Sequence, residues 1–362
     1  MSLLDYINDT VNSVKCYVPG KPTEDVAREF NLNLNDIVKL ASNESPLGVS
    51  PLALEAIKKS AGDMHIYPDG ESLKLRNKLS VFLNVQMEQI IIGDGAEEII
   101  RFISHCFLSP ETSIVTSMHT FPIYKIAANM FGSEVIEVPM KGLTHDLKRM
   151  LDSIKENTRV VYICNPNNPT GSMVENDEII SFMNKVPEDV LVVFDEAYGD
   201  IAQKKIMDTL SYTRDGRNVL VLRTFSKAYG LAGLRVGYGV TTPKIKEVLN
   251  KARLVFNCNR MAQTAAVAAL DDHEYIEKSK EVYKKGIKQI KEACDKLHLE
   301  YEEPYANFIL INVGDGAKVF ELLQREGVIT RPMGGCQLPE WIRVTIGTYQ
   351  ENCKFIEALQ KI

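Results

Sequence analysis

Lys227 is the residue whose type and position most clearly allow chemistry. It follows an apolar run, Val219 to Leu222, that predicts a buried strand of a parallel sheet. Thr224 and Ser226 precede it, and Arg235 follows eight residues later. A lysine amine in this position can condense with an aldehyde to form an imine. A lone lysine beside a serine is more often a solvated residue at a strand end than a catalytic one. A catalytic role for Lys227 therefore depends on which residues the fold brings beside it.

Three other apolar runs predict strands that also end in polar or glycine residues. Because ligands bind outside the carboxyl ends of the strands in an open parallel sheet, we expect these ends to form one site with Lys227. The runs and the residues that follow them are Ile90 to Ile92 before Gly95, Val160 to Cys164 before Asn168, and Val190 to Phe194 before Asp195 and Tyr198.

The chemistry of this set predicts pyridoxal 5'-phosphate as cofactor. Lys227 would form the imine, Asp195 would keep the pyridine nitrogen protonated, and Tyr198 with Asn168 would hydrogen-bond the phenolate oxygen. We therefore predict Lys227, Asp195 and Tyr198 as catalytic residues. The cofactor phosphate would be held by backbone N–H groups at a helix start, by two hydroxyls and by a guanidinium. These groups belong to Gly95, Ala96, Glu97, Thr224, Ser226 and Arg235.

Along nearly its whole length the chain resembles the fold-type I pyridoxal-phosphate aminotransferases of the histidinol-phosphate aminotransferase group. The stretches that carry the resemblance are YVPGKP at 17–22, VKLASNESPLG at 38–48, YPDGESLKLR at 67–76, CNPNNPTG at 164–171, FDEAY at 194–198, TFSKAYGLAGLRVGYG at 224–239, and RPMGG and IRVTIGT near the end.

The resemblance implies two further contacts to the cofactor. Phe121 would lie flat against the pyridine ring, although an aromatic residue after a strand is more often part of a core. Tyr67 would contact the cofactor phosphate of the other subunit, so a homodimer is part of the prediction.

Two arginines near the end of the chain are candidates for binding the substrate. Arg343 lies inside the apolar strand predicted from Trp341 to Ile346, where an unpaired charge is costly, so it should face an anion or a carboxylate. The resemblance implies that Arg343 clamps the acid group of the substrate, with Arg331 and Tyr17 completing a phosphate pocket and Asn43 on the substrate side. The chain departs from the usual family pattern at Ser45, where a second asparagine is more common, and at Cys336, where a tyrosine is common.

Strand and helix patterns alternate from residue 90 to residue 222, which predicts an α/β fold with a mostly parallel sheet between helices. We expect residues 31–245 to form this large cofactor-binding domain. Residues 1–30 and 246–362 would form a smaller α+β domain.

The composition excludes several classes of protein. The net charge is −6 and there is no basic run, so we expect no nucleic-acid partner. No apolar run is long enough to span a membrane and the N-terminus lacks a signal-peptide pattern, which favours a cytoplasmic protein. The seven cysteines are scattered without a CxxC pair and the six histidines show no ligand spacing, so we predict no metal.

These features lead us to expect a reversible transamination. Lys227 would also act as the general acid and base that moves the proton at the substrate carbon. The expected reactants are L-histidinol phosphate and 2-oxoglutarate, which give imidazole acetol phosphate and L-glutamate. The alternatives are an aromatic amino acid aminotransferase, a phospho-amino-acid decarboxylase on the same scaffold, and a protein that binds the cofactor without turnover. A dinucleotide-dependent dehydrogenase is disfavoured because Gly93-Asp-Gly95 lacks the third glycine at the required spacing.

Overall fold

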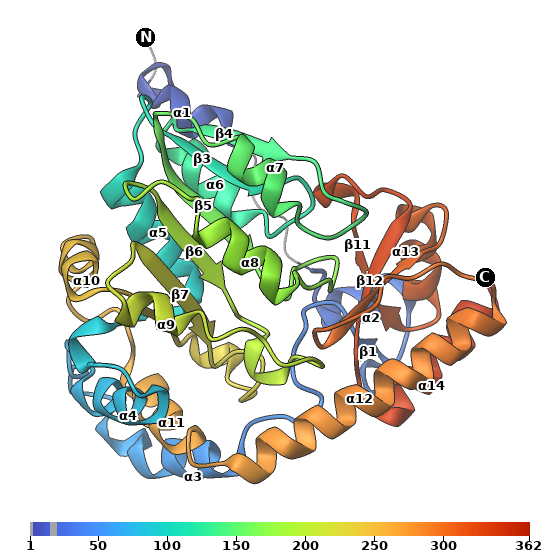
Figure 1. Cartoon of the computed structure of the whole chain (residues 1–362). Coiled ribbons are helices and arrows are strands. Elements are labelled where there is room, and N and C mark those ends of the chain that lie inside the picture. Colours follow the sequence, from blue (N-terminus) through green and yellow to red (C-terminus); the bar gives the residue numbers. More distant parts are fainter. Residues whose placement is uncertain (1–2, 15–19) are drawn as a thin grey trace.

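The centre of the molecule is a seven-stranded sheet (Figure 1). The computed structural model describes residues 3–14 and 20–362. The strand order is β2-β8-β7-β6-β5-β3-β4, and only β8 among these runs antiparallel to its neighbours. The strands are β2 (Ile90–Gly93), β3 (Ser113–Ser117), β4 (Glu134–Val138), β5 (Thr158–Cys164), β6 (Leu191–Asp195), β7 (Val219–Thr224) and β8 (Gly237–Val240). The α/β fold with a mostly parallel sheet is therefore confirmed.

Side chains of β5 alternate between two apolar cores because successive strand residues point to opposite faces. Val160 and Tyr162 pack on one face with α5 (Gly95–Phe107), α6 (Ile123–Met130) and α10 (Pro243–Asn250). Val161 and Ile163 pack on the other face. That face is covered by α4 (Leu73–Leu83), α7 (Leu147–Asp152), α8 (Asn176–Met183), α9 (Leu210–Arg214) and α11 (Arg260–Ala269). Both faces are covered, which explains why these strands are almost uniformly apolar.

A second, smaller layer carries the C-terminal strands. Its antiparallel sheet has the order β11-β12-β9, made of β9 (Phe308–Asn312), β11 (Arg331–Pro332) and β12 (Trp341–Thr345). The helices α2 (Thr23–Phe30), α13 (Gly316–Arg325) and α14 (Tyr349–Gln360) lie around it in Figure 1. A short parallel pair, β1 (Val38–Lys39) with β10 (Val328–Ile329), brings the chain after β1 to this layer. Residues 40–43 therefore run between the two layers.

The helix α12 (His273–Lys296) runs along the molecule from the large sheet to the small layer (Figure 1). Asp272 caps its first turn by accepting a hydrogen bond from the Tyr275 amide. At the other end of the chain, Thr348 and Glu351 form a capping box at the start of α14. Ser50 caps α3 (Pro51–Ser60), whose first residue is a proline, as helix starts favour.

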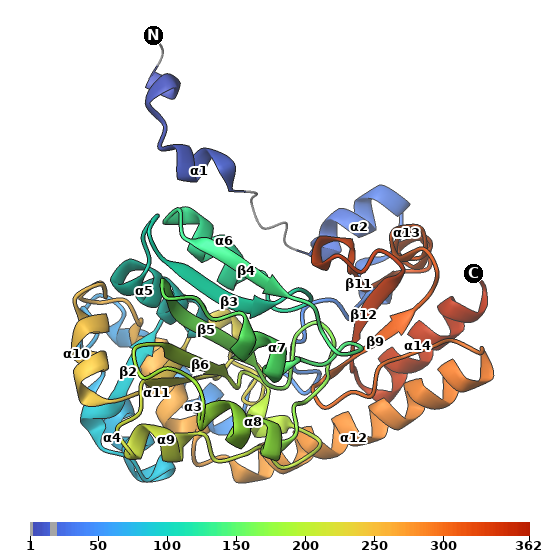
Figure 2. The same ribbon diagram turned by 45° about the horizontal axis from the view of Figure 1, so that its top comes forward.

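The described N-terminal segment contains α1 (Asp9–Ser13) and stands out from the body of the molecule in Figure 2. The Thr10 hydroxyl donates a hydrogen bond to the carbonyl of Met130 at the end of α6. Within residues 3–14 and 20–362, none of the helices is both long enough and apolar enough to cross a membrane.

Candidate active site

The predicted functional residues meet where β5, β6 and β7 end, beside the first turn of α5. Asp195 is the last residue of β6, Thr224 is the last residue of β7, and Gly95 is the first residue of α5. The segment after β1 crosses this edge and contacts both layers. The carboxyl edge of the sheet is where an open α/β fold places its ligand site.

Lys227 lies in the turn after β7 and is partly buried. Its Nζ donates a hydrogen bond of 3.0 Å to the carbonyl of Ser42 and lies 6.0 Å from the centre of the Tyr198 ring. Burial, followed by the positive charge of Arg343, lowers the pKa of the amine from its ordinary 10.5 to about 8. A substantial fraction of this lysine is therefore neutral near physiological pH, which is the form that attacks a carbonyl.

Asp195 is a buried carboxylate with two hydrogen bonds. Its Oδ2 accepts from the Tyr124 hydroxyl at 2.5 Å, and its Oδ1 accepts from the Ala197 amide at 3.1 Å. Burial raises the pKa of Asp195, and these two hydrogen bonds oppose that rise. A carboxylate held this way stays available to a cationic ring nitrogen, which would relieve the remaining cost of burying its charge.

Asn43 connects Tyr198 to the small layer. Its Nδ2 donates to the Tyr198 hydroxyl at 2.9 Å, and its Oδ1 accepts from the hydroxyl of Thr345 on β12 at 3.1 Å. Its backbone has a left-handed φ of 54°, which asparagine adopts more readily than most residues. The amide of Asn43 therefore fixes Tyr198 and joins the two layers at the same point.

Arg343 on β12 points its guanidinium toward the large sheet. Its Nη1 donates a short hydrogen bond to Oδ1 of Asn168, and its Nη2 donates to the carbonyl of Ala41 at 2.7 Å. The guanidinium lies 5.2 Å from the centre of the Phe308 ring. Arg331 on β11 is directly opposite Arg343 across the antiparallel pair. Two cationic side chains thus share one end of the small sheet, beside Asn168.

The first turn of α5 forms a cradle suited to a phosphate. Gly95 has a φ of 74°, and a Cβ at this position would lie 2.5 Å from Nη2 of Arg235. Ala96 and Glu97 follow in the first turn, where backbone N–H groups have no partner within the helix. Only glycine leaves room for the guanidinium so close to these amides. The arrangement is typical of an anion site.

Two hydroxyls lie near the end of β7. The Thr224 hydroxyl donates to the Ser226 Oγ at 3.0 Å and accepts a hydrogen bond from the Ser226 amide. With the cradle at Gly95, the buried carboxylate and the low-pKa lysine, this donor set fits pyridoxal 5'-phosphate. Each charged end of that molecule would meet a group of complementary chemistry.

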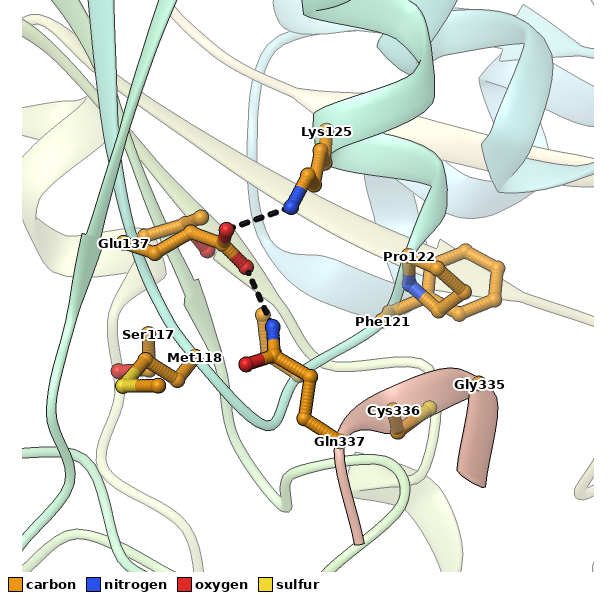
Figure 3. Close-up of a pocket in the computed structure, with 11 residues that line it drawn as sticks. Ser117, Met118, Phe121, Pro122, Lys125, Glu137, Gly335, Cys336 and Gln337 are labelled. Atoms are coloured by element: carbon orange, nitrogen blue, oxygen red, sulfur yellow. Dashed lines mark hydrogen bonds and ion pairs between the residues drawn. The ribbon is translucent and has the colours of Figure 1, made fainter. Parts of the chain in front are cut away.

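Phe121 lies after β3 and lines a pocket of about 360 Å³ between the large sheet and residues 335–337 (Figure 3). Its ring packs edge-on against Tyr124, with centroids 5.6 Å apart. Figure 3 shows Glu137 between Lys125 and Gln337, with N···O distances of 2.5 and 3.3 Å. Residues 335–337 of the small layer therefore close over this side of Phe121.

Tyr67 and Ser45 lie away from these contacts, whereas Cys336 lines the pocket at Phe121. Tyr67 is 76% exposed and stacks on Phe256, with centroids 4.7 Å apart. Ser45 bonds the hydroxyl of Tyr275 at 2.8 Å, and the carbonyl of Cys336 accepts a hydrogen bond from His119 Nδ1 at 2.8 Å. Tyr17 lies outside the described residues.

Three contributors to the site carry no clear signal in the sequence. Tyr124 appears in the sequence as an apolar helix residue, and nothing distinguishes it from the core until its hydroxyl is seen on Asp195. Thr345 is 302 residues from Asn43, and the Ala41 carbonyl is a backbone group that no motif marks. Of these three groups, Thr345 alone could have been noticed in the sequence, because it is a polar residue within an apolar strand.

Comparison with known proteins identifies the relatives of this chain. Residues 35–359 match the family model for class I and II aminotransferases. A histidinol-phosphate aminotransferase of Akkermansia muciniphila is 48% identical over the full length of both chains, and histidinol-phosphate aminotransferase 1 of Dechloromonas aromatica is 42% identical over 100% of this chain and 99% of that one. The crystal structure of histidinol-phosphate aminotransferase from Sinorhizobium meliloti in complex with pyridoxal-5'-phosphate has a TM-score of 0.90 at 28% identity, covering 98% of this chain and 97% of that one.

Proposed function

Because the chain belongs to the family of class I and II aminotransferases, we propose that it transfers the amino group of L-histidinol phosphate to 2-oxoglutarate. The products are imidazole acetol phosphate and L-glutamate, and the reaction is a step of histidine biosynthesis. The observation that carries the substrate assignment is the pairing of Arg331 with Arg343 across β11 and β12, next to the Asn168 contact. Two guanidiniums at one end of a buried sheet suit a phosphate ester.

The cofactor in this proposal is pyridoxal 5'-phosphate, whose pyridinium ring supplies an electron sink when it is bound. Asp195 would hold the proton on the ring nitrogen, and Tyr198 with Asn168 would bind the phenolate oxygen. The phosphate would be held by the amides of Gly95, Ala96 and Glu97 together with Thr224, Ser226 and Arg235, and Phe121 would pack against the ring. The family matched by the chain and the cofactor named with the Sinorhizobium meliloti structure support this assignment.

Lys227 carries both covalent attachment and proton transfer in this mechanism. Its Nζ takes a proton from the substrate carbon in the neutral form and returns it in the charged form. A pKa of about 8 suits both roles, because the amine is then mostly charged at pH 7 but keeps about a tenth of its population in the neutral form. The Ser42 carbonyl, which accepts a hydrogen bond from Nζ at 3.0 Å, positions the amine when the amine is not bound to cofactor or substrate.

The substrate enters from the side of the small layer. Arg343 and Arg331 bind its phosphate, with Tyr17 as a third donor, and Asn43 lies beside the reacting amine. Residues 335–337 close over Phe121 and shape the pocket for the imidazole ring. Cys336 is a smaller side chain than tyrosine and leaves more room there.

We also propose a homodimer, supported by an apolar surface beside Tyr67. Large apolar side chains are strongly exposed in this region, and a contiguous patch of this kind is typical of an interface. They are Ile66 (52% exposed), Tyr67 (76%), Leu254 (71%), Val255 (67%) and Phe256 (46%). In the dimer, Tyr67 contacts the cofactor phosphate of the other subunit.

Two broader assignments also remain proposals. The division into a large domain of residues 31–245 and a small domain of residues 1–30 and 246–362 is supported by the separate sheets. A cytoplasmic location is supported by the free thiols of the six cysteines in the described ranges, since reduced cysteines are normal in that compartment.

The decisive experiment is an absorption spectrum of the purified protein with pyridoxal phosphate, followed by titration with L-histidinol phosphate in the absence of a keto acid. We expect a visible band that is lost to shorter wavelength as the amino group is transferred. A band that responds only to aromatic amino acids would assign the chain to the aromatic aminotransferases. Release of carbon dioxide from a phospho-amino acid would indicate a decarboxylase. A band that no amine changes would indicate binding without turnover.

A further inference from the structure

A second cavity, open to solvent and of about 520 Å³, lies behind the loops that carry the active site. It is bounded by the end of α4, the start of α12 and the turns that follow β6 and β7. Tyr229 is two residues after Lys227, and Asp200 is two residues after Tyr198. The proposed aminotransferase chemistry uses neither of these side chains. Phe82 and Ile276 supply an apolar wall to the same cavity.

The charges around this cavity do not balance. Arg223 binds Glu196 through Nε and Nη2, at 3.0 and 2.8 Å, whereas its Nη1 lies 3.8 Å from Asp200. One guanidinium therefore serves two carboxylates and is closer to Glu196. Lys280, the nearest other cation in the lining, forms an ion pair with Glu277 at 2.9 Å. Two carboxylates, Asp200 and Glu277, therefore line the cavity with one lysine, Lys280, while Arg223 approaches Asp200 from behind the wall and is shared with Glu196.

His273 lines the cavity as well, at its exposed edge. The Asp200 carboxylate, which is only 20% exposed, remains the under-neutralised group at the wall. A partly buried carboxylate in this state attracts a cation.

Tyr229 provides a second, independent sign of a ligand. The residue is 4% exposed and lines the cavity, and its hydroxyl has no hydrogen-bond partner among residues 3–14 and 20–362. Burial, followed by the charge of Asp200, raises the pKa of this phenol, so the hydroxyl stays protonated. A buried hydroxyl normally has a partner, and the open space of the cavity offers a place for one.

We propose that this cavity binds a small aromatic ammonium ion, with Asp200 as its counter-charge and Phe82 and Ile276 against its ring. Two of the lining residues, Phe82 and Tyr229, are aromatic, and aromatic rings attract cations. The cavity is separate from the pocket at Phe121, because the two share no lining residue.

The test uses phenyltrimethylammonium, which has no N–H and cannot condense with an aldehyde. Isothermal titration calorimetry on the protein saturated with pyridoxal phosphate should show saturable binding of one cation per chain. Asp200→Asn should weaken binding about tenfold, because it removes the counter-charge. Phe82→Ala, at a half-exposed position that does not threaten the fold, should weaken it severalfold.

The sign of the electrostatic effect provides the sharpest control. Lys280→Gln removes a cation from the wall and should tighten binding about threefold. Lys278→Gln makes the same charge change on the same helix, at a residue paired with Glu274 outside the cavity, and should leave the affinity unchanged. The proposal is overturned if no saturable binding occurs, if the two lysine variants behave alike, or if benzenesulfonate binds as tightly as the cation.

Discussion

The Tyr124 hydroxyl donates a hydrogen bond of 2.5 Å to Oδ2 of Asp195. The ring of Tyr124 is stacked on Tyr162 with centroids 4.4 Å apart and an interplanar angle of 9°. This packing fixes the hydroxyl under the end of β6, so the carboxylate is held in one orientation. Asp195 is thereby prepared for its partner before any ligand arrives, and Tyr124 acts as a positioning residue.

Tyr124→Phe tests this arrangement. The substitution removes one hydrogen bond to a buried carboxylate, worth about 1–3 kcal/mol. The pKa of Asp195 should rise, the ring nitrogen should lose its charged partner part of the time, and kcat should fall about tenfold with a shifted absorption spectrum of the bound cofactor. The matched control is Tyr162→Phe, because the Tyr162 hydroxyl is buried without a partner in the described part of the chain. Equal losses in the two variants would show that only packing matters.

The pKa of Lys227 sets a pH dependence for cofactor attachment. Only the neutral amine attacks an aldehyde, so the attachment rate in protein freed of cofactor should rise with pH and level off above a midpoint of about 8. Arg343 is the largest nearby charge that lowers this pKa, so Arg343→Gln should move the midpoint upward. Stopped-flow absorption with added pyridoxal phosphate measures the rate. A midpoint near 10.5, or an unmoved midpoint in the variant, contradicts the prediction.

Arg325→Gln is the control for the effect of charge. Arg325 pairs with Glu321 on the exposed side of α13, and its removal changes the net charge equally. The midpoint for Lys227 should not move in this variant. A shift of the same size would mean that overall charge, and not the field of Arg343 at the site, sets the pKa.

Gly95→Ala should weaken cofactor binding at the phosphate end. The new Cβ would lie 2.5 Å from Nη2 of Arg235. The alanine would also have to keep the backbone φ of 74°, which costs about 1–2 kcal/mol in strain alone. Gly142→Ala separates the two effects, because Gly142 has a φ of 60° with no atom within 4 Å of the added Cβ. We expect both variants to lower the melting temperature, but only Gly95→Ala to raise the dissociation constant for pyridoxal phosphate, by about tenfold. Unchanged cofactor affinity in Gly95→Ala would argue against the cradle.

The sequence could predict the central strands because β5, β6 and β7 are uninterrupted apolar runs that end in polar residues. It did not reveal β8, whose Gly237 and Gly239 give no strand signal although the strand is buried and paired on both sides. The glycines are needed there because a Cβ on Gly237 would lie 2.4 Å from the Ala96 amide. Because the close packing of α5 against β8 requires glycines, and glycine has a low strand propensity, propensity does not predict this strand.

In the site, too, contacts set by strand ends could be predicted from the sequence, whereas contacts between distant segments could not. Lys227, Asp195 and Thr224 could be predicted as neighbours because strand ends meet at one edge of a parallel sheet. Arg343 was predicted on an apolar strand and is 9% exposed on β12, where its guanidinium binds the carbonyl oxygens of Asn168 and Ala41. That it faces an anion or a carboxylate stays a prediction. Its bond to Asn168 and the bond of Thr345 to Asn43 join residues 175 and 302 positions apart, and only the packing of two layers sets such contacts.

The exposed Tyr67 leads to a prediction about the assembled protein. If Tyr67 completes the active site of the other subunit, Tyr67→Ala and Lys227→Ala should each lower activity, the first by at least tenfold and the second to background. Mixed and refolded together, they should form hybrid dimers in which one site has both Lys227 and a Tyr67 from the partner. Activity should therefore reappear on mixing, because the closed two-fold symmetry of a dimer places each residue in the other chain's site. Kinetic assay of the mixture against each variant alone measures this, with size-exclusion chromatography to verify dimers. No recovery from a mixture that contains hybrids would place Tyr67 outside the partner's site.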